Sequence, residues 1–145
     1  MEASLVGSEM CIRDRHYDLF KKYQKKRHEN GLMSKMSWAN YSNMINRTPI
    51  NSMIFEYKSL KGNILGVMLI DIQRDGLSAV YSFYDTTDKK LSIGKYMIID
   101  TINFVKDNKL NYLYLGYFVK ENHKMNYKNQ FHPYEIYING KWSKN

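Results

Sequence analysis

Residues 64–118 constrain the fold more than any other stretch of this 145-residue chain. The run 64–72 is apolar nearly throughout, which is typical of a central strand that is covered on both faces. Residues 73–76 then predict a turn, because Asp-Gly between two strand-like runs is the strongest short-range hairpin signal. We expect Gly76 to adopt a positive φ in that turn and residues 77–85 to form the partner strand. The stretch therefore predicts an antiparallel hairpin at the centre of a sheet.

A helix and a further strand follow this hairpin. Ser92 is the expected N-cap of the helix, and residues 108–109 end it. Its apolar positions recur at i, i+4 and i+7 with apolar neighbours beside them, and they are Ile98, Ile102 and Val105 with Met97, Ile99 and Phe104. Residues 112–118 are the next strand. A strand, a crossover helix and a second strand form a right-handed unit, so 77–85 and 112–118 should run parallel.

Shorter elements lie on both sides of this stretch. They are helices at 17–30 and 38–46, a strand at 53–58, a short helix near 124–129, a strand at 134–138 and a hairpin turn at 139–140. Ser37 is the expected cap of the second helix. Two helices, an antiparallel meander, a crossover helix and a splayed parallel strand are the order of elements in the acetyltransferase-like (GNAT) fold. We therefore predict an α/β (α+β) domain with a mixed sheet of that type.

The chain is basic, with a formal net charge of +8 and a pI near 9.4. Such a charge favours a polyanionic partner. The chain is also rich in Lys, Asn, Ile and Tyr, a mixture that AT-rich coding gives to any protein, so charge alone does not decide for nucleic acid. In the helix at 17–30, the apolar spacing turns aromatic residues to the core and basic residues to solvent: Tyr17, Phe20 and Tyr23 against Lys21, Lys22, Lys25, Lys26 and Arg27.

Cysteine usage and hydropathy indicate the cellular compartment. Cys11 is the single cysteine, so the chain can form neither an internal disulfide nor a cysteine-based metal site. No stretch has the apolar length of a membrane span, and the start lacks the basic and apolar regions of a signal peptide. We expect one soluble, cytoplasmic domain without membrane association.

The first fifteen residues lack periodic apolar positions that a core would use. Residues 5–15 resemble the translation of a sequencing-library adapter. We therefore expect residues 1–15 to be a non-native segment and residues 16–145 to be the domain.

The loop that opens the crossover helix bears on the acyl donor. Acetyl-CoA users of the fold carry a Gln/Arg-x-x-Gly-x-Gly/Ala loop, whose backbone amides hold pyrophosphate. Residues 89–95 contain one glycine and do not meet that pattern, which disfavours acetyl-CoA. Lys89, Lys90 and Lys95 still make the helix start attractive to an anion. A solvated lysine cluster is the alternative interpretation.

Six ordered motifs carry a closer resemblance. They are D-G-L-S-A-V-Y-S-F-Y-D at 75–85, L-S-I-G at 91–94, Y-x-Y-L-G-Y at 112–117, K-M-N-Y-K at 124–128, F-x-P at 131–133 and G-K-W at 140–142. With Tyr23-x-x-x-Arg27-His28 they resemble the C-terminal domain of the aminoacyl-tRNA-protein transferases over residues 17–142. The nearest branch is the bacterial aspartate/glutamate leucyltransferases, relatives of arginyl-tRNA-protein transferase. Family members begin with a further Cys-containing domain, which we expect to be absent here.

The resemblance implies transfer of an aminoacyl group, leucine in the nearest branch, from aminoacyl-tRNA to the α-amine of proteins that begin with Asp or Glu. That transfer marks the proteins for degradation in the N-degron pathway. The implied partners are aminoacyl-tRNA and proteins with acidic N-termini, and no cofactor is implied beyond the tRNA co-substrate. Two alternatives stay open: a truncated or inactive tRNA- or protein-binding domain, and an acetyl-CoA-dependent N-acetyltransferase.

The candidate site residues follow from what this reaction needs. The attacking amine must be neutral, the tetrahedral oxyanion needs a donor and the acidic side chain needs a cation. The candidates are Asp85, Tyr84 and Tyr117 for catalysis, Arg27, His28, Tyr114, Lys124 and Lys128 for substrate binding, and Lys89, Lys90 and Lys95 for tRNA or another anion. A strand-end Asp also caps loops, tyrosines also pack in cores and lysine pairs also face solvent. We predict no metal site, because His123 and His132 have no metal-like cluster around them.

Overall fold

The computed structural model of the chain describes residues 1–5, 10–29, 31–46, 50–119, 121 and 125–144. The chain divides into two compact units, residues 1–114 and residues 115–145. The first unit contains a sheet with helices on it, and the second contains a 3₁₀ helix and a two-stranded hairpin.

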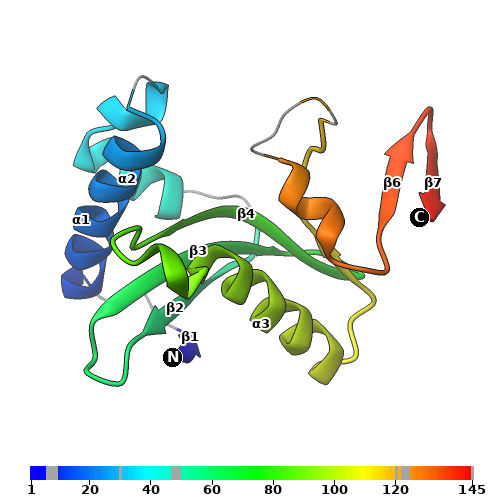
Figure 1. Ribbon diagram of the computed structural model, residues 1–145, viewed down its shortest axis with the longest axis horizontal. Coiled ribbons are helices and arrows are strands. Elements are labelled where there is room, and N and C mark those ends of the chain that lie inside the picture. Colours follow the sequence, from blue (N-terminus) through cyan, green and yellow to red (C-terminus); the bar gives the residue numbers. More distant parts are fainter. Residues whose placement is uncertain (6–9, 30, 47–49, 120, 122–124, 145) are drawn as a thin grey trace. The chain divides into compact units, whose positions relative to one another are not determined.

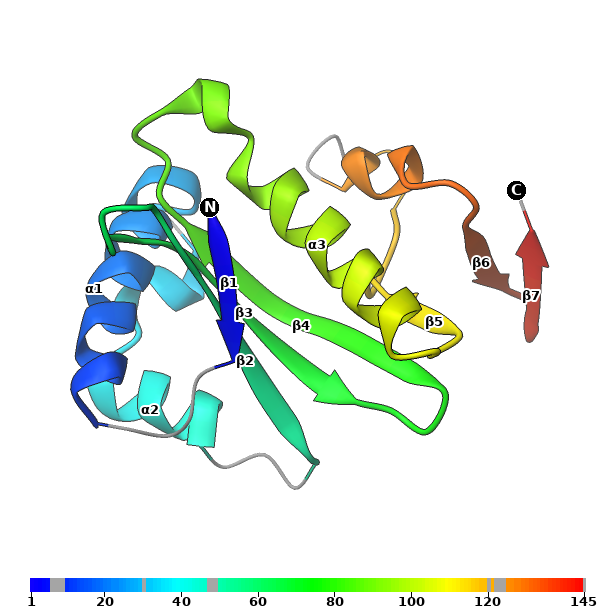
Figure 2. The same ribbon diagram turned by 90° about the horizontal axis from the view of Figure 1, so that it is seen from below.

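A five-stranded mixed sheet is the framework of the first unit. In spatial order its strands are β1 (Glu2–Leu5), β2 (Ser52–Lys58), β3 (Ile64–Ile72), β4 (Gly76–Tyr84) and β5 (Tyr112–Tyr114). Neighbouring strands are antiparallel except β4 and β5, which are parallel. Figures 1 and 2 show the meander and the crossover through a helix. The predicted mixed sheet is confirmed.

Helices cover both faces of the sheet (Figures 1 and 2). They are α1 (Met10–Arg27), η1 (Leu32–Lys35) and α2 (Trp38–Asn46) on one face, and η2 (Lys89–Leu91) and α3 (Ile93–Asp107) from the other side. Successive residues of β3 pack on opposite faces of the sheet. Val67 belongs to the core cluster with α1, while Gly66 lies against Met97 of α3 and the Met68 sulfur lies 3.4 Å from the Thr101 hydroxyl oxygen. This two-sided burial explains the unbroken apolar run of β3.

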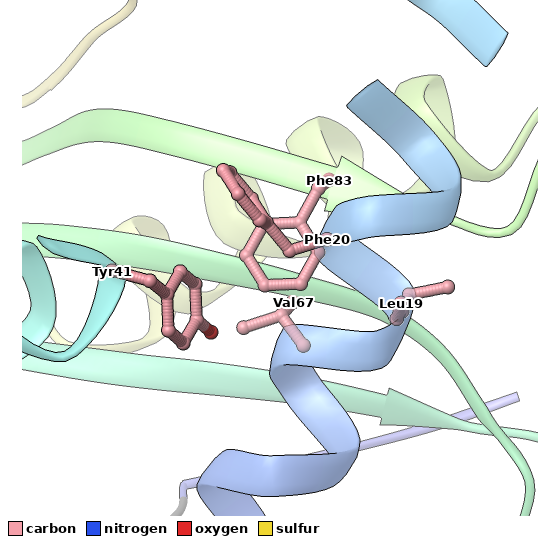
Figure 3. Close-up of a cluster of buried hydrophobic side chains, with 5 residues drawn as sticks. All are labelled: Leu19, Phe20, Tyr41, Val67 and Phe83. Atoms are coloured by element: carbon pink, nitrogen blue, oxygen red, sulfur yellow. The ribbon is translucent and has the colours of Figure 1, made fainter. Parts of the chain in front are cut away.

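A mainly aromatic cluster joins α1 and α2 to the sheet (Figure 3). Its buried members are Leu19, Phe20, Tyr41, Val67 and Phe83. The Phe20 ring centroid lies 5.0 Å from that of Tyr41 and 5.6 Å from that of Phe83, the latter pair edge to face at 83°. Such tilted ring pairs add to the stabilisation that area burial provides. Burial also raises the pKa of the Tyr41 hydroxyl, which keeps that group neutral.

Helix α2 has the predicted bounds, and the backbone N–H of Asn40 donates a 3.3 Å hydrogen bond to the Ser37 hydroxyl. The predicted cap at Ser37 is therefore confirmed.

Helix α3 begins directly after Ser92, its predicted N-cap residue, but without the side-chain bond expected of that residue. Ser92 precedes the helix but has a φ of 42° and no side-chain capping bond. Its carbonyl instead accepts hydrogen bonds from the Lys95 and Tyr96 backbone at 3.0 and 3.1 Å. The predicted side-chain cap at Ser92 is wrong, because the left-handed backbone leaves the main chain to satisfy these donors.

The buried face of α3 is also turned from the predicted one. The i, i+4 row that meets the sheet is Ile93, Met97, Thr101 and Val105, with Ile98 beside it. Ile99, predicted to face the core, is 50% exposed. A polar residue occupies the middle of this row because the Thr101 hydroxyl donates to the Met97 carbonyl at 2.8 Å.

The central hairpin is confirmed, but the reason given for its glycine is wrong. The positive-φ glycines in the described chain are Gly62, Gly116 and Gly140, and Gly76 is not among them. The turn closes at Gln73, whose N–H donates to the Gly76 carbonyl at 2.9 Å, so Gly76 is already the first residue of β4. A Cβ at Gly76 would lie 2.1 Å from the Tyr112 carbonyl oxygen. The glycine is needed for the close approach of β5.

The parallel pairing of β4 and β5 is confirmed over a short register, Gly76 to Ser78 against Tyr112 to Tyr114. The strand predicted at 112–118 ends at Tyr114, where the first unit ends.

Residues of the first fifteen do form regular structure. Strand β1 pairs with β2 in the register Glu2 to Lys58 through Leu5 to Phe55, and α1 begins at Met10 rather than at the predicted Tyr17. Setting this segment aside when predicting elements was therefore wrong.

Whether the segment is dispensable stays a prediction. Deleting residues 1–15 is expected to shift the thermal midpoint by only about a few degrees, because it removes only a four-residue edge strand and the first six residues of α1. Thermal unfolding of a chain that starts at His16 measures this shift. A loss of more than about 10 °C would show that the paired strand is an essential part of the sheet.

The second unit contains η3 (Asn126–Gln130), β6 (Glu135–Ile138) and β7 (Lys141–Lys144). Asn139 and Gly140 connect the two strands with φ of 51° and 80°, as their sequence predicts. Within the described parts of both units, no helix combines the length and apolarity needed to cross a bilayer.

Candidate functional site

A pocket of about 630 Å³ in the first unit brings together α1, the β2–β3 turn and the loop that follows β4. Its lining residues are Arg15, Asp18, Leu19, Lys22, Tyr23 and Lys26 from α1, Gly62, Asn63 and Ile64 from the turn and β3, and Tyr84, Asp85, Thr86 and Thr87 from β4 and its loop. The α1 members recur at i, i+3, i+4, i+7, i+8 and i+11, so they form one face of the helix. Two of the three catalytic residues predicted from sequence, Tyr84 and Asp85, lie in this pocket.

Charges of both signs line the pocket. Arg15, Lys22 and Lys26 provide three cations on α1, and Asp18 and Asp85 provide two carboxylates. A ligand with an anionic group and an amine would find a partner for each.

Asp85 follows β4, and its backbone N–H donates to the Leu65 carbonyl at 2.8 Å. Its Oδ1 accepts from the Thr87 backbone N–H at 2.8 Å and from the Thr87 hydroxyl at 2.5 Å. Asp85 therefore caps its loop, which was the simpler interpretation of this residue. The same bonds hold its half-buried carboxylate at the pocket wall.

Tyr84 lies between α1 and α3. Its ring centroid is 5.0 Å from that of Tyr23, and its hydroxyl accepts a 3.2 Å hydrogen bond from Arg27 Nη2. On the other side, a Cβ at Gly94 would come within 2.9 Å of the Tyr84 ring. His28, exposed at the end of α1, has its ring centroid 5.9 Å from that of Tyr23. Arg27 and His28 thus adjoin the pocket through the two tyrosines without lining it.

The structure separates Tyr114 from this site. The Tyr114 hydroxyl donates to Asp75 Oδ2 at 2.9 Å. Asp75 precedes β4, whereas Tyr84 is its last residue, and Tyr114 pairs with Ser78 near the start of that strand. Tyr114 does not line the pocket, because β5 pairs with only the first residues of β4, and its role in substrate binding stays a prediction.

Tyr117 and Lys128 lie in the second unit. Tyr117 is 90% exposed, and its carbonyl accepts a 2.7 Å hydrogen bond from Lys128 Nζ. Burial lowers the pKa of the Lys128 ammonium group. Lys124, the predicted partner of Lys128 on one helical face, lies outside the described residues.

The described side chains among the lysines before and within α3 do not line the pocket, and contact of these lysines with an anion stays a prediction. Lys90 and Lys95 are exposed, and the Lys90 backbone N–H donates to Asp88 Oδ1 at 2.9 Å. The Lys89 backbone belongs to η2, and its side chain is outside the described part. Among the described residues, no group of three or more His, Cys, Asp or Glu side chains is arranged to hold a metal ion.

The family of the arginine-tRNA-protein transferase C terminus matches residues 15–138. The chain belongs to this family. It is 43% identical over 132 residues to the aspartate/glutamate leucyltransferase of Nitrosococcus oceani, covering 91% of this chain and 56% of that protein. It is 42% identical over 130 residues to the aspartate/glutamate leucyltransferase of Ruegeria pomeroyi, covering 89% of this chain and 48% of that protein. The chain thus spans about half the length of the curated relatives it matches.

Solved structures support the fold of this transferase-family chain. A GNAT-family acetyltransferase from Staphylococcus aureus Mu50 matches with a TM-score of 0.65 at 15% identity, covering 94% of this chain and 87% of that one. At such low identity the likeness shows the fold alone, and it confirms the predicted acetyltransferase-like architecture.

The cationic wall of the pocket is a feature that sequence reasoning on this transferase-family chain missed. Lys22 and Lys26 are exposed, as predicted, but their place in the pocket wall was not predicted, and Arg15 lay in the segment set aside. The signal was present in their spacing of i, i+7 and i+11, which places all three on one helical face.

A buried ionic cluster was also missed. His16 Nε2 of α1 lies 2.5 Å from Glu56 Oε2 of β2, and Lys58 Nζ lies 2.5 Å from Glu56 Oε1. His16 is 1% and Glu56 0% exposed. A Glu-x-Lys pair on alternate residues of a strand is visible in the sequence, but its histidine partner is 40 residues away.

Proposed function

We propose that the chain transfers an aminoacyl group, leucine, from aminoacyl-tRNA to the α-amine of proteins that begin with Asp or Glu, in the N-degron pathway. The observation that carries this proposal is the 43% identity, over 91% of the chain, to a relative named aspartate/glutamate leucyltransferase. We propose aminoacyl-tRNA and acidic N-termini as partners and the cytoplasm as the compartment.

The pocket offers groups of the right charge for an acidic N-terminal residue. Its side-chain carboxylate would meet Lys22 and Lys26, while its α-amine would lie toward Asp85. An ammonium group is not a nucleophile, so the amine must lose a proton before it attacks the ester carbonyl. Asp85 accepts that proton or orients the amine, because one of its oxygens is already fixed by Thr87.

Tyr84 is the proposed donor to the oxyanion. The Tyr84 hydroxyl oxygen accepts the Arg27 hydrogen bond, so its own proton is directed to another acceptor. In the transfer, the bond from the acyl carbon to the tRNA ribose oxygen breaks, an amide bond forms and the ribose oxygen takes up a proton. Tyr117 remains a candidate for the same role, and Lys90, Lys95 and Lys128 remain candidates for contacts with tRNA phosphates.

The test is an assay of leucine transfer with the 145-residue chain. Labelled leucyl-tRNA is mixed with peptides that begin with Asp, Glu, Asn or Ala, and acetyl-CoA is offered separately as a donor. We expect leucyl product from the Asp and Glu peptides only. Binding of the tRNA without product from any peptide would favour an inactive binding domain, and acetylated product would favour an N-acetyltransferase.

Asp85→Asn should lower the transfer rate on the order of 10²-fold. The amide keeps an oxygen that can accept the Thr87 hydrogen bonds, so the loop stays folded while the basic carboxylate is lost. Single-turnover rates with the Asp peptide give the comparison.

Asp88→Asn is the matched control, because Asp88 also caps a backbone N–H, that of Lys90, but does not line the pocket. It should retain the parent rate. Parent-like transfer by Asp85→Asn would remove Asp85 from the mechanism and leave it a loop cap.

A further inference from the structure

The hairpin of the second unit presents an exposed aromatic pair. Tyr137 of β6 lies directly opposite Trp142 of β7, with ring centroids 5.1 Å apart and ring planes inclined by 53°. Tyr137 is 59% and Trp142 54% exposed. Glu135 and Lys144, the next pair on the same face, flank the rings at one end. Two large aromatic side chains exposed side by side on a two-stranded ribbon are a candidate binding surface.

The charge of this unit indicates what that partner is. Residues 115–145 contain five lysines against two glutamates, with no aspartate or arginine. Tyr117 and Tyr127 of the same unit are also exposed. Lysines interspersed with exposed aromatic rings are typical of surfaces that bind single-stranded nucleic acid, where bases stack on the rings and cations meet the phosphates.

We propose that Tyr137 and Trp142 form a stacking platform for the unpaired bases of a single-stranded RNA end, with Lys141 and Lys144 meeting its phosphates. The proposal rests on the proposed function, since the unpaired 3′ end of the tRNA substrate is the RNA that the platform would hold. Stacking uses the base faces, so the platform binds any short unpaired end and rejects a blunt duplex, whose bases are already stacked. It anchors the tRNA end without taking part in the acyl transfer.

The experiment measures binding of uncharged RNA to the whole chain. The probes are a short single-stranded RNA that ends in CCA and a blunt duplex of the same sequence, at two salt concentrations. Stacking should quench the fluorescence of Trp142, while Trp38 packs against Tyr17 and Tyr41 in the first unit and should respond little.

Two substitutions at one position separate stacking from folding. Trp142→Leu keeps an apolar side chain on the strand but has no π face, and we expect it to weaken binding of the single strand about tenfold or more. Trp142→Phe keeps a ring and should stay within about threefold of the parent. Tyr112→Ala, which removes a 43% exposed tyrosine from the first unit, is the matched control and should bind as the parent does.

Equal affinity of the leucine and phenylalanine variants, or equal affinity of the parent for duplex and single strand, would overturn the proposal. So would a Trp142→Leu variant that binds RNA normally but loses affinity for a peptide with an acidic N-terminus, which would make the hairpin a protein-binding surface. Because the RNA is uncharged, the result is independent of leucine transfer: a chain that shows the tryptophan effect but transfers no leucine retains the platform and loses the proposed function.

Discussion

Glu56→Ala is expected to lower the free energy of unfolding by about 3 kcal/mol or more. Glu56 is fully buried and receives both His16 Nε2 and Lys58 Nζ at 2.5 Å. Removing the carboxylate leaves the buried imidazole without its acceptor, whereas Lys58, 35% exposed, can turn to water. Urea unfolding of the variant measures the loss. Glu29→Ala, an exposed glutamate just after α1, should change the stability by less than about 0.5 kcal/mol.

The same cluster gives stability a defined pH dependence. Burial lowers the pKa of His16 below its ordinary 6.5, outweighing its bond to Glu56, while the charges of Arg15 and Lys58 also lower it. Burial alone would raise the pKa of Glu56, but bonds from Lys58 and His16 hold it below its ordinary 4.5. The unfolded chain therefore binds more protons at acidic pH, and stability should fall below about pH 6.5 and again below about pH 4.5.

Replacing His16 separates the two stages. In His16→Gln the decline between pH 7 and 5 should flatten, while the decline below pH 4.5 remains. A parent-like slope in the variant would mean that the pKa of His16 is the same in the folded and the unfolded chain, so that His16 does not cause the decline.

Gly76→Ala is expected to destabilise by about 3 kcal/mol, and Gly76→Val by at least as much. A Cβ would meet the Tyr112 carbonyl oxygen at 2.1 Å and its carbon at 2.9 Å. Because both are backbone atoms held by the β4–β5 pairing, the strand itself must move. Denaturant unfolding is the measurement, and loss of the pairing should also increase hydrogen exchange of the β5 amides.

Two controls separate steric contact from backbone strain. Asn tolerates positive φ, so Gly76→Asn would be mild if the turn required that conformation, but it should be as costly as Gly76→Ala if contact decides. Gly62→Ala is the converse case, with a φ of 80° and nothing within 4 Å, and should cost about 1 kcal/mol. A loss of stability in Gly76→Asn clearly smaller than in Gly76→Ala would instead support a positive φ at Gly76.

Periodicity predicted the elements whose burial follows from local pattern. The run at β3, the capped helix α2 and the Asn139-Gly140 turn each carry their own signal and occur where expected. The prediction of a positive φ at Gly76 was wrong, because glycine is needed there for the close approach of Tyr112. That residue lies 36 positions later in the sequence and is brought close by the crossover. The buried face of α3 was also predicted wrongly. Thr101 is polar in the sequence, and only the structure shows that its hydroxyl is hydrogen-bonded within the helix, which lets it be buried.

The site was predictable in part. The motif at 75–85 placed Tyr84 and Asp85 at the end of a strand, and both line the pocket. The place of Lys22 and Lys26 in the pocket wall was not predicted. A basic helical face is usually solvated, and the sequence does not show that a loop from elsewhere in the chain lies beside it. Tyr114 shares a motif with Tyr117, but its hydroxyl bonds to Asp75, which lies at the other end of β4 from Tyr84, and the sequence motif does not show this.

The contact between Gly94 and the ring of Tyr84 has a consequence for how this family can change. Gly94 does not line the pocket, yet any larger residue there would press on a ring that does, since a Cβ would lie only 2.9 Å from it. Displacing the ring would disturb the Arg27 bond to its hydroxyl and reshape the pocket wall without altering a lining residue. A substitution at this helix position is therefore expected to change the shape of the pocket while every lining residue stays the same.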